Sequence, residues 1–486
     1  MKPQNLIILM SDEHSVRTVG CYGNKLVKTP HIDALAARGT RFRSAYCTSP
    51  VCIPARAGFA LGKYQHQIGF WDNADPYDGS VPSWHHRLRG RGHNVTAIGK
   101  LHFRSAEEDN GFSAELIPMH VIDGKGDLMG LVREDMPERK GAKKMAGMAG
   151  PGESIYTRYD RDIAEQAQIW LREQALKHQD KPWVLFVSFV APHFPLSAPS
   201  EYFYHYYLHP DLPWPKQYAR SDRPQHPYLL EYGSVFAYDK YFDSDDKIRR
   251  AIAGYYGLCT FLDEQIGKVL AALDDTGLSS NTRVIYTSDH GDNLGARGVW
   301  GKSTMYEEAV AVPLIVAGES IPKGHVVSEH ASHVDVYPFI FECVGEAGEL
   351  KREEGLPGTS LATLAADARP ERTVISEYHG MGSSGAVFMV RFGPHKYVHY
   401  INCPPQLFNL EEDPQELKDL AGDSAYAHVL EEGRARLYAI LNPNKVDHRV
   451  KDRQRELLAL NGGRDAVIAR GDLGFSVPPG VAPMFD

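Results

Sequence analysis

The feature that most limits how this chain can fold is a set of short apolar runs separated by long amphipathic stretches. The runs at residues 5–10, 183–190 and 284–287 are bounded by polar residues, as is typical of strands buried on both faces of a parallel sheet. Helical spacing of apolar residues at 30–38 and 256–273 predicts helices between them. Strands that alternate with helices predict an α/β fold with a large, mostly parallel sheet sandwiched by helices.

The pattern changes after about residue 370. Short strands are predicted at residues 373–376, 387–391 and 396–399, followed by a charged helical stretch at 427–440. From residue 461 the sequence is rich in glycine and proline, as in an extended tail. We therefore predict an α/β domain at 1–370, a smaller α+β subdomain at 371–460 and an extended C-terminal tail at 461–486 that could join two copies of the chain as a homo-oligomer.

Charge and hydropathy exclude several classes of function. The formal net charge is −9 over 486 residues, and no run of five or six like charges offers an arm for nucleic acid or a membrane. The first apolar run is shorter than the ~7–15 residues of a secretory signal, and no later segment approaches the ~18 needed to cross a bilayer. We expect a cytoplasmic protein with no nucleic-acid or membrane partner.

The sequence Cys-Ile-Pro-Ala-Arg at residues 52–56 is the sharpest local feature. Pro54 suits the first turn of a helix that begins near Cys52, where free N–H groups and the helix dipole favour an anion. Arg56 lies four residues further on the same helical face, so a cation would stand beside whatever Cys52 holds. The alternative interpretation is an ordinary buried helix start.

Acidic residues follow two of the apolar runs. Asp12 comes after the first run, and Asp289 and His290 come after the run at 284–287. Neighbouring parallel strands would bring both ends to one edge of the sheet, where open α/β folds hold ligands. Carboxylates with an imidazole can bind one divalent cation, whereas a lone Asp at a strand end is more often a turn former or a helix cap.

Basic residues are predicted at the same edge. Lys100 and His102 follow an apolar stretch at 95–98, and in an extended strand they would project to one side because the side-chain period is two. His193 closes the run at 183–190. We therefore expect Lys100 and His102 to meet one ligand and His193 to lie at the same edge of the sheet.

Together these motifs resemble the sulfatase family of the alkaline phosphatase superfamily. Residues 52–56 match the CxPxR signature, with Ala55 where the family usually has serine, and residues 29–42 and 263–292 resemble the stretches around that signature and the metal site. The resemblance spans about residues 5–320 and is closest to the choline sulfatase and phosphonate monoester hydrolase branch. It implies an alkaline phosphatase-like fold and a sulfuric ester hydrolase (sulfatase).

The resemblance implies a modified residue and a metal ion. Cys52 would be converted to formylglycine by a maturation enzyme, and the aldehyde hydrate would attack a small-molecule sulfate ester. The family commonly has Asp-Asp and Asp-Asn at its acidic pairs, so Glu13 and His290 are departures. The resemblance favours Ca²⁺ and leaves Mn²⁺, Mg²⁺ and Zn²⁺ open. The implied metal ligands are Asp12, Glu13, Asp289, His290 and the modified Cys52.

The resemblance also implies roles for the basic residues. Lys100 and Lys302 would bind the sulfate, and His102 would take a proton from the sulfated hydrate. His193 and Lys302 would assist the departing oxygen, while Arg56 would offset charge beside the nucleophile.

Other functions stay open at this point. A phosphonate monoester or phosphodiester hydrolase uses the same scaffold, although that branch typically replaces Lys100 and His102. A choline sulfatase would bind its substrate through Asn73 and Glu377, but Asn73 could equally form an Asx turn, and residues 122–133 contain no Trp or Tyr for an ammonium group. A metal or anion binder without catalysis would keep Cys52 as a thiol.

Overall fold

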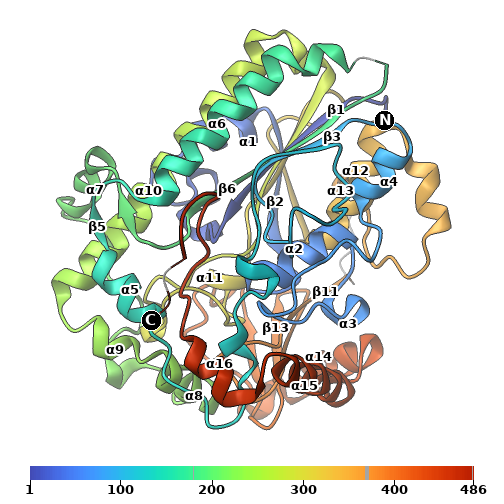
Figure 1. The fold of residues 1–486 in the computed structure, drawn as a ribbon. Helices are drawn as coiled ribbons and strands as arrows, with labels where there is room; N and C mark the ends of the chain where they lie inside the picture. Colours follow the sequence, from blue (N-terminus) through green and yellow to red (C-terminus); the bar gives the residue numbers. More distant parts are fainter. Residues whose placement is uncertain (179, 367–371, 484, 486) are drawn as a thin grey trace.

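An eight-stranded sheet forms the centre of the computed structural model, which describes residues 1–178, 180–366, 372–483 and 485 (Figure 1). Strand β9 runs antiparallel to β2 and β8, and the other neighbouring pairs are parallel. The predicted mostly parallel α/β sheet is therefore confirmed. In spatial order the strands are β10 (His325–Ser332), β2 (Gly39–Tyr46), β9 (Leu314–Ala317), β8 (Thr282–Ser288), β1 (Asn5–Asp12), β6 (Val184–Pro192), β3 (Val95–Lys100) and β4 (Ala114–Met119).

The predicted apolar runs form the middle of this sheet. Every residue of β1 is buried, and Ile8 lies opposite Phe186 of β6 and Ile285 of β8. Helix α10 (Asp245–Asp275) packs on β6, while α12 (Val336–Val344) packs on β1, and Figure 1 shows the two helices on opposite sides of the sheet. Because both faces are covered, these strands need consecutive apolar residues.

Further helices pack around the central sheet. Helix α2 contacts α12 and α4, and α6 contacts β6 and α10. A small two-stranded sheet joins β5 (Gly150–Pro151) and β7 (Ser197–Ala198). The helices are α1 (Pro30–Ala37), α2 (Cys52–Leu61), α3 (Gln65–Ile68), α4 (Trp84–Gly90), α5 (Gly141–Met148), α6 (Ile155–Glu173), α7 (Ser200–Tyr207), α8 (Pro227–Phe236), α9 (Tyr238–Tyr241), α11 (Glu307–Val310) and α13 (Leu361–Ala366).

A four-stranded antiparallel sheet makes the predicted C-terminal subdomain. Its strands are β11 (Thr373–Tyr378), β12 (Val387–Phe392), β13 (His395–Tyr400) and β14 (Gln406–Asn409). Helix α14 (Ala427–Ile440) packs on β12 and β13, and α15 (Pro443–Leu460) follows it. The proposed boundary at 370 and 371 lies outside the described residues.

The C-terminal tail differs from the extended segment that we predicted. Residues Gly463–Arg470 form helix α16, which buries Val467 against Leu131. A short apolar stretch between glycines is enough for a helix here because α15 and the segment around Leu131 offer it an apolar surface. After Arg470 the described residues contain no helix or strand, yet Leu473 and Phe475 are buried within the same chain. Pairing with a second copy through this tail stays a prediction.

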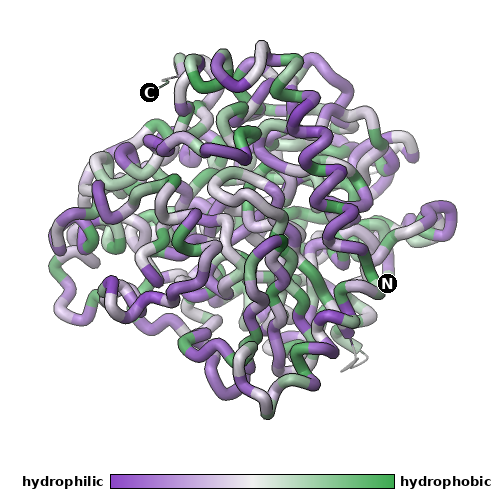
Figure 2. The backbone as a smooth tube through the Cα atoms, turned by 90° about the horizontal axis from the view of Figure 1, so that it is seen from below, coloured by the Kyte–Doolittle hydropathy of each residue, from purple (hydrophilic) through white to green (hydrophobic). Residues whose placement is uncertain are grey.

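Hydrophobic segments gather inside the molecule and hydrophilic ones along its outline (Figure 2). Among the described helices, none combines the length and the apolar character needed to cross a membrane.

Candidate active site

The carboxyl ends of four neighbouring strands carry predicted site residues. Asp12 ends β1 and Lys100 ends β3, while His193 follows β6 and Asp289 follows β8. Because these strands pair in parallel, the four residues reach one edge of the sheet, and all four are buried. The structure thus brings them together, and their chemical roles stay predictions.

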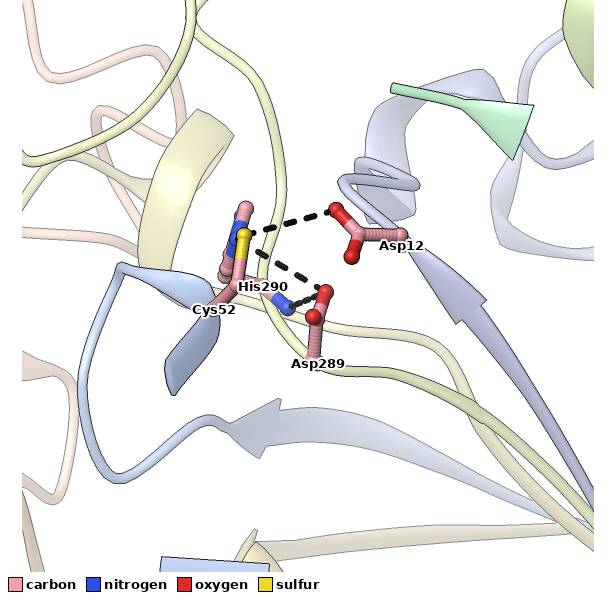
Figure 3. Close-up of side chains that lie close together, drawn as sticks. All are labelled: Asp12, Cys52, Asp289 and His290. Atoms are coloured by element: carbon pink, nitrogen blue, oxygen red, sulfur yellow. Dashed lines mark hydrogen bonds and ion pairs between the residues drawn. The ribbon is translucent and has the colours of Figure 1, made fainter. Parts of the chain in front are cut away.

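Cys52 is the first residue of α2, and its sulfur meets three polar groups. Lys302 Nζ lies 3.0 Å from Cys52 Sγ. His290 Nε2 lies 3.2 Å from the same sulfur and Asp12 Oδ1 lies 3.6 Å from it (Figure 3). The helix starts here as predicted, with Pro54 in its first turn. The cysteine is therefore enclosed by an ammonium group, an imidazole and a carboxylate.

Two overlapping groups of side chains at this edge are arranged as metal ligands would be. Within each group the ligand atoms lie within 4.8 Å of one another, and every member is buried. Carboxylate oxygens with an imidazole nitrogen are a donor set that suits a divalent cation, so the residues present fit a metal ion. The first group is Asp12, Cys52, Asp289 and His290, and the second is Asp12, Glu13 and His193.

Glu13 has an unusual backbone conformation, and its carboxylate lies beside Lys302 and His193. Its backbone has φ 65°, in the left-handed region that costs about 1–3 kcal/mol for a residue with a side chain. Its N–H donates to Asp289 Oδ1 at 3.1 Å, and Tyr255 OH donates to its carbonyl at 2.6 Å. Glu13 Oε2 lies 3.3 Å from Lys302 Nζ and 3.4 Å from His193 Nε2. Glu13 therefore joins the second group only.

Arg56 binds both carboxylates of the first group. Its Nε donates to Asp289 Oδ2 at 2.8 Å, and its Nη2 donates to Asp12 Oδ2 at 3.1 Å. Nη1 donates to Ser188 Oγ at 2.9 Å, an interaction of a polar residue within the apolar run of β6 that we did not predict. Arg56 is thus the expected cation beside the cysteine, but it acts on the acidic residues around Cys52.

The charge of Asp12 is strongly stabilised. Burial alone would raise the pKa of Asp12, but the cations Lys100 and Arg56 lower it well below its ordinary value. Lys100 Nζ lies 2.6 Å from Asp12 Oδ2. Asp12 is therefore a carboxylate near neutral pH, as a metal ligand must be.

Lys100 and His102 do not share one strand face as we predicted. Strand β3 ends at Lys100, and Gly99 and His102 have φ values of 97° and 57°, so the side-chain period of two does not apply. Lys100 turns inward to Asp12, whereas His102 lines a cavity and its Nε2 lies 2.8 Å from Ser476 Oγ. The strand geometry that we assumed for the pair is therefore wrong, and a ligand shared by Lys100 and His102 stays a prediction.

His193 and Lys302 flank the cysteine from the cavity side. His193 Nδ1 lies 2.6 Å from the carbonyl oxygen of Phe194, which fixes the ring. Burial, followed by the charge of Lys302, lowers the pKa of His193 well below its ordinary value. His193 is therefore neutral near pH 7, and Lys302 is the cation of this pair.

A cavity opens in front of Cys52, and most of the predicted substrate contacts line it. Ile53 N donates to Asn73 Oδ1 at 3.2 Å, which places this amide beside the start of α2. Aromatic rings of Tyr232, Phe236 and Phe475 line it further out. The predicted site residues on its wall are Glu13, Cys52, Asn73, His102, His193 and Lys302.

Glu377 is not among the residues that line this cavity. The side chain is fully buried in β11, with Oε1 2.6 Å from His66 Nδ1 and Oε2 3.1 Å from His379 Nε2. Its predicted role in substrate binding is therefore wrong, because two histidines of the fold already occupy the carboxylate.

Glu377→Gln should lower the free energy of unfolding in a pH-dependent way. Burial alone would raise the pKa of Glu377, but His66 and His379 lower it to about 2. A depressed carboxyl pKa stabilises the fold above the unfolded value, and this effect is lost as the pH falls toward the folded value. We expect E377Q to lose about 3 kcal/mol near pH 6 and roughly half of that near pH 3, measured by urea unfolding.

Glu431→Gln is the matched control for this experiment, because Glu431 lies in an exposed pair with Arg434. It should change the free energy of unfolding little at either pH. A loss in E377Q that is equal at both pH values would contradict the pKa of Glu377.

The fold and the site define an α/β protein in which a buried cysteine lies beside side chains arranged as metal ligands would be. The family model described as Sulfatase matches residues 4–346, and the model described as N-sulphoglucosamine sulphohydrolase, C-terminal, matches residues 295–442. The chain therefore belongs to the sulfatase family, whose members are hydrolases that act on sulfate esters.

Known proteins of this family are similar along most of the chain. The choline-sulfatase of Rhizobium meliloti (strain 1021) is 30% identical over 426 residues, which cover 86% of this chain and 82% of that protein. Arylsulfatase K of Danio rerio is 28% identical over 435 residues, covering 86% and 80%. The crystal structure of a phosphonate monoester hydrolase of Agrobacterium radiobacter has a TM-score of 0.68 at 22% identity and covers 90% of this chain and 95% of that one. The last similarity concerns the fold.

Proposed function

We propose that this chain hydrolyses sulfate monoesters with a nucleophile derived from Cys52 by oxidation to formylglycine. One observation carries the proposal: Cys52 Sγ lies 3.0 Å from Lys302 Nζ, 3.2 Å from His290 Nε2 and 3.6 Å from Asp12 Oδ1. A nucleophile at this position has a cation for the anionic ester and metal-binding side chains on its other side. A maturation enzyme would have to act on residues 52–56 before α2 is buried.

The unmodified thiol is a poor candidate for this chemistry. Burial, followed by the negative charge of Asp12, raises the pKa of the Cys52 thiol above its ordinary value. A thiol that keeps its proton is a weak nucleophile. The aldehyde hydrate would instead supply a hydroxyl group, and a divalent cation would offset its developing negative charge.

Two basic residues that line the cavity, Lys302 and His102, have separate roles in the proposed reaction. Burial opposes the charge of Lys302, but the acidic groups around it raise its pKa well above the ordinary value, so it keeps its proton. It can bind the sulfate and offset charge on the departing oxygen. Burial lowers the pKa of His102 well below its ordinary value, so its ring is neutral and can accept the proton that releases the sulfate.

For the metal we propose Ca²⁺, held by Asp12, Asp289, His290 and the modified Cys52. Two carboxylates and a hydroxyl group make a mainly oxygen donor set, which supports Ca²⁺, while the imidazole keeps Mn²⁺, Mg²⁺ and Zn²⁺ as alternatives.

We also propose a cytoplasmic location. All six cysteines are free, which is typical of a reducing compartment.

A choline-type ester is a second candidate substrate. The support is the 30% identity to a choline-sulfatase together with the aromatic rings of Tyr232, Phe236 and Phe475 in the cavity, since ring faces attract quaternary ammonium groups. Glu377 is buried elsewhere, and two carboxylates that line the cavity outside the metal-binding groups, Asp127 and Asp472, bind Arg139.

Peptide mass spectrometry across Cys52, combined with turnover on the same sample, tests the proposal. We expect an aldehyde at Cys52 and a preference for a phenyl sulfate over the matched phosphonate monoester and phosphodiester, with choline sulfate as a further substrate. Chelation should remove the activity, and Ca²⁺ should restore it better than Mn²⁺, Mg²⁺ or Zn²⁺. An aldehyde with a preference for the phosphorus esters would favour the hydrolase of that class, and an unmodified thiol in protein from its own host would favour a binder without catalysis.

A further inference from the structure

The segment 472–476, defined here as the tail strap, lies against the wall of the catalytic cavity. Asp472 fixes its start: Arg139 Nη2 donates to Asp472 Oδ1 at 2.9 Å, and the N–H groups of Lys140 and Gly141 donate to Oδ2 at 2.7 and 3.2 Å. Arg139 also binds Asp127 at 2.9 Å. Charge-assisted bonds between buried groups are the stronger kind of hydrogen bond, so the strap has a firm attachment.

An aromatic contact fixes the middle of the strap. Phe475 is 7% exposed, and its ring centre lies 5.7 Å from that of Tyr156 and 5.6 Å from that of Phe194. Both contacts are edge-to-face, the arrangement that aromatic rings prefer. Phe194 follows His193, so the strap rests on the same loop that carries a predicted catalytic residue.

Ser476 ends the strap at a second predicted catalytic residue. Its Oγ lies 2.8 Å from His102 Nε2, and its carbonyl oxygen accepts a hydrogen bond from Tyr156 OH. The other ring nitrogen of His102, Nδ1, is buried and has no hydrogen-bond partner among the described residues. One nitrogen of the ring is thus held by the tail, and the other is left without a protein partner.

We propose that the tail strap completes the catalytic site and that Ser476 is the positioning residue of His102. This rests on the proposed function, from which the proton-accepting role of His102 follows. With Nε2–H donating to Ser476 Oγ, the hydrogen bond fixes the plane and the tautomer of the imidazole, which leaves the lone pair of Nδ1 to take the proton. His102 lies beyond the end of β3 at φ 57°, and Ser476 Oγ is the side-chain group that binds its ring.

Ser476→Ala should therefore act on the chemical step. We expect kcat for a sulfate ester to fall about tenfold, the lower end of what loss of a histidine's orienting partner costs, with little change in KM. Ser476→Thr keeps the hydroxyl group and should restore most of kcat. Val477→Ala is the matched control, because Val477 belongs to the same stretch but does not line the cavity.

A double-mutant cycle separates positioning from a general loosening of the tail. If Ser476 acts through His102, S476A should lower kcat no further in a His102→Ala background. An unchanged kcat in S476A, an equal loss in V477A, or a full additional loss in the H102A background would each overturn the inference.

A readout without turnover keeps this test independent of the proposed function. Diethyl pyrocarbonate modifies free imidazole nitrogens, and peptide mass spectrometry can follow its reaction at His102. We expect faster modification of His102 in S476A than in the wild type, S476T or V477A, because Nε2 then becomes a second ring nitrogen without a partner. Equal rates in all four proteins would refute the contact even if the wild type hydrolyses no sulfate ester, and that last result alone would count against the proposed function.

Discussion

Cys52→Ala should lower kcat/KM for a sulfate ester by at least about 10⁴-fold, as expected when a covalent nucleophile is removed. The variant keeps Asp12, Asp289 and His290, three members of the first metal-binding group. We therefore expect Ca²⁺ binding, measured by calorimetry, to be weaker but present. Circular dichroism should show an unchanged fold, because only one sulfur atom is lost from a site bounded by polar groups.

Cys259→Ala is the matched control for this variant. Cys259 is also buried, but it lies in α10, and its sulfur contacts Thr18 rather than a predicted site residue. It should cost some stability, as small cavities do, and leave kcat unchanged. Wild-type turnover by C52A in a purified sample would refute the mechanism.

The central sheet, and the edge of it that carries the predicted site residues, could be predicted from the sequence because strands that are buried on both faces leave a clear pattern of apolar residues. A strand covered on both faces needs consecutive apolar residues, and the apolar runs at 5–10, 183–190 and 284–287 lie within β1, β6 and β8 for this reason. Once these strands are placed in parallel, Asp12, His193 and Asp289 must reach the same edge. The start of α2 at Cys52 could also be predicted, because it depends on the local sequence: Pro54 suits the first turn of a helix.

The errors arose where a side chain depends on distant residues or on the backbone conformation. Nothing near Glu377 in the sequence shows that His66, more than 300 residues earlier, occupies its carboxylate. Positive φ at Gly99 and His102 breaks the strand geometry that we assumed for Lys100 and His102. Ser476 lies 374 residues from His102 in the sequence. The glycine and proline content around Ser476 predicts an extended tail and gives no sign of that contact.

Arg56→Met should cost about 3–5 kcal/mol of unfolding free energy in the presence of a chelator, because it leaves buried carboxylates without their cation. Arg56 is 3% exposed and binds Asp12 and Asp289 directly, and methionine fills a similar volume without the charge. Lys100 still pairs with Asp12 in this variant, so Asp289 is the carboxylate that loses its positively charged partner. Urea unfolding with chelator and with Ca²⁺ measures the effect.

Arg434→Met is the control for this prediction, since Arg434 pairs with Glu431 on the exposed face of α14. Exposed pairs of this kind contribute about 0.2–1 kcal/mol, so R434M should unfold nearly like the wild type. Ca²⁺ should recover part of the loss in R56M and none in R434M, because a cation bound between Asp12 and Asp289 would replace the missing charge. Equal losses in the two variants, or a loss in R56M that Ca²⁺ does not reduce, would mean that Arg56 does not neutralise the metal-binding carboxylates.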